Sequence, residues 1–371
     1  MNPVPEPWSI TAPGCNIKSI MRFLKPLILR LISFAQKHPG LLAVFGFLSG
    51  LASFVLIERS EQLAQGIAVM MLVSWTWLTL EQTLRQSVLS RFGLDLPPGV
   101  IRFATQMVHQ ESFFFVLPFF LAATHWHTGQ VAVTGLLGLC ALVTLIDPLY
   151  FRGLASRRTL FVIFHALALF ATLLVALPII VHLTTSESFI AALCISLLLS
   201  LPGLKTLFPS DALWRVPVLA VMLLALAWGT WQLREWVPGV PMRLASVSVT
   251  HELDRENRIP GESLAQVDAN KLHWDGLYAW TAIRVPRGLR ETVYHVWRQN
   301  GEEVDRIPMT VSGGREQGYR AWSHKLHFPA DPVGDWEVQV ITGTGQMIGR
   351  VRFQVIPSPV LPPGELPFAD G

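Results

Sequence analysis

The sequence predicts a multi-domain protein, in which an α-helical transmembrane bundle of about seven spans precedes an all-β immunoglobulin-like sandwich. Of the 371 residues, 51% are hydrophobic and only 15% are charged, whereas soluble domains carry roughly 25% charged residues. The charge is also uneven: residues 1–233 hold 14 Lys+Arg and 9 Asp+Glu, and residues 234–371 hold 15 and 17. From Pro241 onward, long apolar runs give way to apolar residues at every second position, a pattern typical of strands.

Residues 1–39 are predicted to form a cytoplasmic tail. Within it, residues 17–37 repeat apolar residues at helical spacing beside Lys18, Arg22, Lys25 and Arg30. This pattern fits a helix lying on an anionic membrane surface, and equally a basic lead-in to the first span. Met21 opens such a lead-in better than Met1 does, so both remain candidate starts.

The membrane domain is predicted at residues 40–233, because crossing the hydrocarbon core takes about 20 apolar residues. Seven segments qualify: 40–58, 62–81, 103–124, 128–147, 159–182, 186–204 and 213–232. The third is the weakest, because polar residues at positions 106 and 109–111 precede its apolar core.

The loops between these segments predict the orientation. Thirteen basic residues fall on one side of the predicted bundle, and one, Arg59, falls on the other. Under the positive-inside rule, this places the N-terminus in the cytoplasm and the C-terminal body in the periplasm of a bacterial inner-membrane protein. The lipid bilayer is therefore an expected partner. A basic excess confined to such loops gives no reason to expect nucleic acid.

The C-terminal part is predicted to be a linker and first strand region at 234–276 and a sandwich core at 277–356, with the sandwich overall spanning about 242–356. Candidate strands are 243–252, 277–285, 292–299, 303–311, 319–328, 335–341 and 347–356. Asn300-Gly301 and residues 342–345 are hairpin signals. Residues 253–275 form a polar connection, in part helical, and the proline-rich residues 357–371 are predicted to be a disordered tail.

An ordered set of residues in this part resembles a bacterial family of domains of unknown function numbered 2914. The set comprises His295-Val296-Trp297, then Gly301, Val304 and Arg306, then Tyr319–Lys325, Gly334–Val338 and Gly345–Gly349. The resemblance covers roughly residues 277–356, and His324 departs from it where a basic residue is expected. It implies the fold and an envelope location, and it brings no activity.

Three ionisable residues in the predicted spans are candidates for chemistry: His109, Glu111 and His165. Counted from Arg102 and Arg158 at about 1.5 Å per residue, they lie at similar depth. Ionisable groups inside a membrane normally face protein or water and are functional candidates, here for a proton or ion relay. Glu111 is rotated by roughly 200° from His109, so no metal site is predicted. The alternatives are a polar stripe that joins helices, or a third span that starts late.

A second candidate set lies on the sandwich: Trp297, Arg320, Trp322, Ser323 and Lys325. One face of the 319–328 strand carries Arg320, Trp322 and His324. Aromatic rings beside arginine could hold a sugar or a peptide. The alternative is that the tryptophans belong to the core and that Arg320 is a surface charge with its stem packed down.

The sequence contains none of the motifs His-Glu-x-x-His, Gly-x-Ser-x-Gly, Cys-x-x-Cys or the Walker loop, so no catalytic residue and no cofactor is predicted. The favoured function is a non-enzymatic envelope anchor or binding protein, with an envelope protein or a cell-wall glycan as partner. The alternative is a transporter or a membrane-embedded enzyme that uses His109, Glu111 and His165.

Overall fold

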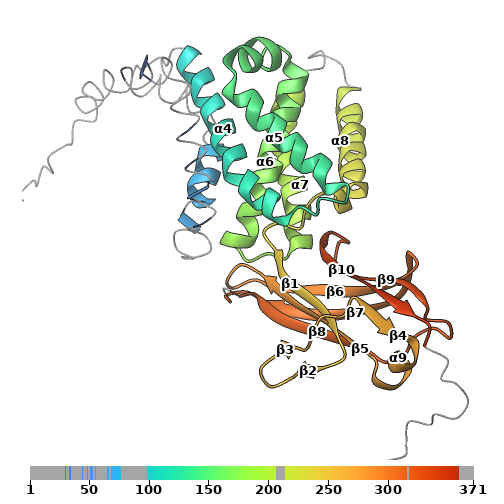
Figure 1. Cartoon of the computed structure of the whole chain (residues 1–371). Helices are drawn as coiled ribbons and strands as arrows, with labels where there is room; N and C mark the ends of the chain where they lie inside the picture. Colours follow the sequence, from blue (N-terminus) through green and yellow to red (C-terminus); the bar gives the residue numbers. More distant parts are fainter. Residues whose placement is uncertain are drawn as a thin grey trace, which may run out of the picture.

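A computed structural model describes residues 98–205, 214–315 and 317–358, together with residues 68–76 and scattered positions between 30 and 66. A helical body packs end-on against a β-sandwich (Figure 1). The predicted N-terminal amphipathic stretch, the first predicted span and the proline-rich tail lie largely outside the described residues. The second predicted span, 62–81, is described only at residues 65, 66 and 68–76.

The helical body is built from antiparallel helices that follow one another along the chain. They are α4 (Pro98–Ala123), α5 (Gln130–Leu145), α6 (Arg158–Ile180), α7 (Thr185–Lys205) and α8 (Arg215–Gln232), with a π-helical turn η1 (Pro148–Leu154) after α5 and a 3-10 turn η2 (Arg234–Trp236) after α8. α4 packs against α5 and α6, and α6 packs against α7. Phe113, Leu137, Leu169 and Phe189, one from each of α4 to α7, share one buried core with Trp75.

The prediction of seven spans is wrong for the described part of the chain. There, only α6 is a single helix long and apolar enough to cross a membrane; α5 and η1 would add a second span only if two helices bent by 104° counted as one. α4 does not qualify, because polar residues in the first half of α4 lower its mean hydropathy. Because α5 stops after 16 residues, it covers about 24 Å, less than the roughly 30 Å of a hydrocarbon core. The apolar stretches of α7 and α8, Thr185–Leu201 and Val216–Gln232, are also shorter than the roughly 20 residues that a membrane span needs.

The C-terminal part consists of two packed sheets, as expected for a β-sandwich. Its elements are β1 (Arg243–Thr250), β2 (Leu253–Asp254), β3 (Ile259–Pro260), β4 (Gln266–Asp268), α9 (Ala269–Asp275), β5 (Leu277–Arg284), β6 (Arg290–Gln299), β7 (Glu302–Ser312), β8 (Tyr319–Lys325), β9 (Gly334–Thr342) and β10 (Met347–Ile356). One sheet has the order β1-β5-β8 and the other β4-β10-β9-β6-β7. Each of the seven predicted strands is present, and the polar connection contains the β2–β3 hairpin, β4 and α9.

Two buried clusters fill the space between the sheets. Residues of both sheets, among them Ala279 of β5 and Trp297 of β6, form the cluster farther from the helical body. Ile283 of β5 and Val293 of β6 belong to the cluster nearer to it. The predicted Asn300–Gly301 turn joins β6 to β7 with both residues at positive φ, as a tight hairpin turn requires.

Hydrogen bonds join the sandwich to the lower end of the helical body in Figure 1. The Glu291 carboxylate accepts from the backbone N–H and the hydroxyl of Thr185, at 2.6 and 2.9 Å. Gln130 donates to the carbonyl of Met347 at 2.9 Å, and Arg234 donates to the carbonyl of Thr344 at 3.0 Å. These bonds fix which end of the sandwich meets the helices.

Candidate functional site

Three of the five sandwich residues singled out from the sequence lie in its interior. The Trp297 ring is fully buried and packs edge-on against Phe353. Ser323 bonds to the ring of His295 at 2.8 Å. The Lys325 side chain is 4% exposed and its ammonium pairs with Asp305 at 2.8 Å, and this pairing lowers the pKa of the Asp305 carboxyl. All three side chains therefore hold strands together.

Arg320 and Trp322 lie on the outer face of the three-stranded sheet. Register pairs Trp322 with Trp280 and Arg320 with Ala282. The β2–β3 hairpin folds over this face, because the indole N–H of Trp280 donates to the carbonyl of Arg258 at 3.1 Å. The Arg258 guanidinium in turn lies 5.9 Å from the centre of the Trp322 ring.

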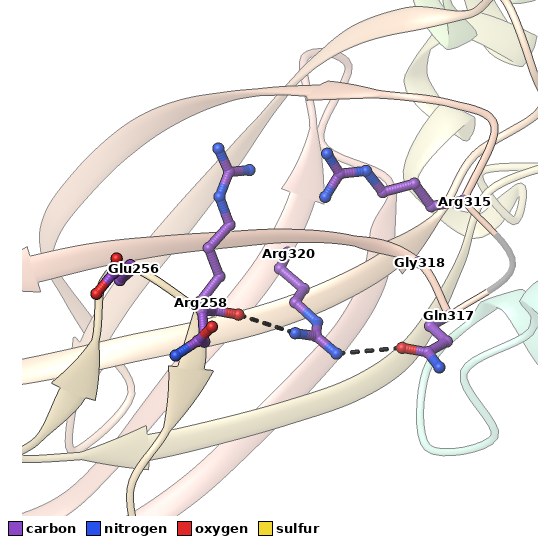
Figure 2. A pocket seen from close by; sticks show the side chains of 7 residues that line it. Glu256, Arg258, Arg315, Gln317, Gly318 and Arg320 are labelled. Carbon is purple, nitrogen blue, oxygen red and sulfur yellow. Dashed lines mark hydrogen bonds between the residues drawn. The ribbon is translucent and has the colours of Figure 1, made fainter.

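An open pocket of about 650 Å³ lies between the tip of this hairpin and the start of β8. We call it the arginine pocket; it is lined by Glu256, Asn257, Arg258, Arg315, Gln317, Gly318 and Arg320. Figure 2 shows the Arg258 and Arg315 side chains reaching toward one another, while Arg320 turns the other way. The Arg320 guanidinium donates to the carbonyl of Asn257 at 3.0 Å and to Gln317 at 3.1 Å.

The described residues that line the arginine pocket carry a net positive charge. Three guanidinium groups face a single carboxylate, Glu256, among the described residues that line it. Arg258 and Arg315 also lie over the ring of Tyr319, at 6.0 and 5.5 Å. Guanidinium groups in a shared opening bind carboxylate or phosphate groups through paired N–H donors.

Arg258 and Arg315 were missed by the sequence reasoning, and only Arg320 was found. The run Asp254-Arg255-Glu256-Asn257-Arg258 carries a turn signal, since the Asp254 carboxylate accepts from the N–H groups of residues 256 and 257. Arg258 adopts φ of +54°, which is uncommon outside glycine and is concentrated at functional sites. Nothing in the spacing of these residues shows that the hairpin folds onto β8.

The helical body brings together two of the three ionisable candidates. Nε2 of His109 lies 3.0 Å from Nδ1 of His165, and Nδ1 of His109 lies 2.8 Å from the Tyr150 hydroxyl. His109 is fully buried. The Trp75 ring packs edge-on against His165 at 4.6 Å. The result is a buried chain of hydrogen bonds from α6 through α4 to η1.

Glu111 does not complete a metal site with these histidines. In the described part of the chain, no three His, Cys, Asp or Glu side chains are placed to hold a metal ion together.

The fold and these sites define a chain of two parts, a helical body with a buried histidine pair and a β-sandwich with an arginine pocket. The chain belongs to a family of unknown function, DUF5924, whose model matches residues 21–279. Residues 290–355 match a second family of unknown function, DUF2914, which confirms the resemblance seen in the sequence. No curated protein and no solved structure matches the chain.

Proposed function

We propose that the chain is an inner-membrane anchor whose helical body lies in lipid and whose sandwich binds an anionic partner in the periplasm. The surface of the helical body supports its place in lipid. Large apolar side chains point outward from it, among them Leu139, Ile163, Val221, Leu224 and Trp228. Exposed apolar surface of this kind marks contact with a membrane or a protein.

The interior of the same body is polar in places. Gln106, His109, Gln110, Gln130 and Thr172 are buried. Polar groups inside and apolar groups outside are the arrangement that a lipid environment favours.

The distribution of basic residues supports the orientation. Arg102, Arg152, Arg158 and Arg215 lie at helix ends remote from the sandwich. A basic end on the cytoplasmic side and a sandwich at the other end follow the positive-inside rule.

The observation that carries the binding function is the arginine pocket. Three arginines line one opening with a single described carboxylate, and nearby aromatic rings add apolar surface beside them. The pocket therefore suits a partner with carboxylate or phosphate groups, such as a cell-wall glycan or an acidic segment of an envelope protein.

Crosslinking in living cells tests this function. A photoreactive amino acid replaces Gln317 in the pocket of the full chain, and a second chain carries it at Glu302, which is exposed at the far end of the sandwich. We expect a specific adduct from position 317 that is lost when Arg258 and Arg320 are both changed to Gln. The same adducts from both positions, or a position-317 adduct that survives the double change, contradicts the pocket as the binding site.

The histidine pair favours a second candidate function, proton or ion transfer through the helical body. A chain of Tyr150, His109 and His165 passes a proton when each member gives up one proton and accepts another. Proteoliposomes with an internal pH dye test this function. Flux that falls in His109→Asn and His165→Asn, but not in the exposed-site variant Leu139→Ala, supports transfer; flux equal to that of empty vesicles rules it out.

A further inference from the structure

Charged residues are unevenly distributed along the long axis of the sandwich. Acidic residues gather at the end away from the helical body: Asp268, Asp275, Glu302, Glu303, Asp331 and Asp335. Arginines gather at the end that meets the helices, at the start of β1, the end of β5, the β5–β6 loop, the start of β6 and the β7–β8 loop. We call this second group the arginine rim: Arg243, Arg284, Arg287, Arg290 and Arg315.

Contacts with the helical body show that the rim lies at the junction. A Cβ placed on Gly288 would come within 2.6 Å of the His182 ring in the α6–α7 connection. Glu291, one residue after Arg290, bonds to the first residue of α7. The rim therefore borders the surface where the sandwich meets the helices.

The rim is continuous with the arginine pocket. Register places Arg243 opposite Arg284. Arg284 lies two residues beyond Ala282, on the same face of β5, and Ala282 is paired with Arg320. Across the loops, a Cβ on Gly314 would meet the side chain of Arg287 at 3.3 Å, next to Arg315. One band of guanidinium groups thus runs from the pocket to the junction.

Four arginines of this band lack an ion pair within the described part of the chain. Arg287, Arg290, Arg315 and Arg320 form no ion pair with a described carboxylate. In contrast, arginines toward the far end are paired, as Arg306 is with Glu303 at 2.9 Å and Arg352 is with Glu337 at 2.7 Å. Glu291, which follows Arg290 in the chain, is buried and already accepts two hydrogen bonds from Thr185.

We infer that the arginine rim binds the phosphate groups of anionic phospholipids in the leaflet around the helical body. This inference rests on the proposed function, because only a helical body in lipid brings the rim to headgroup level. Guanidinium groups match phosphate through paired N–H donors. Long arginine side chains at the edge of a bilayer place their heads among the headgroups and their stems along apolar surface. Lipid contacts would fix the sandwich upright on the membrane and orient its pocket.

Lipid retention by the full chain tests the inference. The protein is reconstituted into vesicles that mix phosphatidylglycerol with phosphatidylcholine and extracted in mild detergent, and the retained lipids are measured by mass spectrometry. The wild type should retain phosphatidylglycerol in excess over the vesicle composition. Arg284→Gln/Arg287→Gln/Arg315→Gln should lower that excess about tenfold.

A matched control removes the same charge from sites away from the rim, as Lys271→Gln/Arg306→Gln/Arg352→Gln, and should keep the excess. If the rim variant fails to fold, Arg287→Gln alone is used, since this side chain is exposed on a loop. The salt dependence of the wild type gives a further measurement: high salt during reconstitution should reduce the excess.

The remaining outcomes each decide the question. Equal retention of the two lipids, or equal loss in the rim and control variants, overturns the lipid assignment. The detergent-solubilised chain is also compared in inorganic phosphate and in dioctanoyl-phosphatidylglycerol. Equal stabilisation by the two would mean that the arginines bind a free anion, and this too would overturn the lipid assignment. If alkaline carbonate strips the chain from cell membranes, the proposed membrane function fails, and the lipid assignment fails with it. If the chain stays in the carbonate pellet, the membrane function stands, and loss of lipid retention then counts against the lipid assignment alone.

Discussion

His295 links the two sheets of the sandwich through its ring. Thr281 donates its hydroxyl proton to the carbonyl of Ala321, so it accepts from Nε2–H of His295 at 3.2 Å. Nδ1 is then left to accept the hydroxyl proton of Ser323 at 2.8 Å. Only the neutral ring satisfies all of these bonds, and burial lowers the pKa of His295 to about 3.

The sandwich should therefore lose stability in mild acid. The His295 pKa is depressed in the folded state, so its stabilisation is complete above the unfolded value of about 6.5 and falls away as the pH drops from there toward 3. The loss should be on the order of 1 kcal/mol per pH unit. Hydrogen exchange of β6 and β8 between pH 7 and pH 5 measures it. The His295→Gln variant should be less stable at pH 7, and its stability should be nearly independent of pH over this range. If the variant keeps the wild-type dependence of stability on pH, a group other than His295 causes that dependence.

Lys325 and Asp305 form a pair whose members are unequally buried, at 4% and 41% exposed. Removing the carboxylate leaves a buried ammonium group without its counter-charge, whereas replacing the lysine removes the buried charge itself. We expect Asp305→Ala to lower the free energy of unfolding by about 2 kcal/mol, and Lys325→Met by clearly less. Urea unfolding midpoints measure both. The reverse order would mean that the lysine stem, and not its charge, holds β8 in place.

For single residues, the sequence identifies side chains of interest but not whether each is buried in the core or exposed on the surface. The motif residues Trp297, Ser323 and Lys325 were identified from the sequence, but a motif does not distinguish a residue that holds the core from one that binds a ligand. Alternation along β8 placed Arg320 and Trp322 on one face, and the register bears this out. Arg258 reaches that face from a hairpin more than 60 residues away, which no local pattern records.

Among the elements, the break between α5 and η1 has an identifiable cause. In a continuous helix, the carbonyl of Thr144 would accept from the N–H of residue 148, but residue 148 is proline and has none. The side-chain amide of Gln106 donates to this carbonyl at 3.0 Å and to Asp147 at 2.8 Å. The break turns the chain by 104° and brings Tyr150 to His109.

Gln106→Leu should therefore destabilise the helical body, because it leaves the buried Thr144 carbonyl without its donor. The expected cost is about 1–3 kcal/mol. The thermal unfolding midpoint of the detergent-solubilised chain and hydrogen exchange over residues 144–152 measure it. Leu139→Ala, at an exposed position on α5, is the control and should change neither. Equal effects of the two changes would show that the amide does not hold the bend.

The predicted strands of the sandwich are present, whereas the predicted number of membrane spans is wrong for the described part of the helical body. Strand alternation is local, so the run from Trp336 to Val340 is enough to predict β9. A hydropathy window, in contrast, scores residues 128–147 as one apolar run and cannot detect that α5 stops at Leu145. Depth counting along the helices fared better, since it placed His109 and His165 at one level and their rings meet.

For the whole molecule, the two family matches meet inside the sandwich and not between the two parts. The DUF5924 match ends at residue 279, within β5, and the DUF2914 match begins at residue 290, at β6. Because β5 pairs with both β1 and β8, the three-stranded sheet contains residues of both matched regions. The arginine pocket does the same, with Arg258 from the first region and Arg315 and Arg320 from the second. Neither region contains the whole pocket.

Glu291 is the polar group that most directly couples the sandwich to the helices. Its carboxylate accepts the N–H of Thr185 at the first turn of α7, where helix N–H groups lack partners and negative charge is stabilising. Burial nevertheless raises the pKa of Glu291, the hydrogen bonds from Thr185 oppose that rise, and the nearby Glu187 adds to it. A raised carboxyl pKa contributes stability that is complete below the unfolded value, about 4.3, and is lost as the pH rises through the folded value.

The junction should therefore open more readily as the pH rises above about 4.3. Hydrogen exchange of residues 183–187, compared across pH after correction for intrinsic rates, measures this opening. Glu291→Gln keeps an oxygen that can accept both bonds but cannot titrate, so the opening should become independent of pH. Glu291→Ala removes the acceptor and should open the junction at every pH, with a loss of about 1–2 kcal/mol. If Glu291→Gln keeps the pH dependence of the wild type, a different group at the junction carries it.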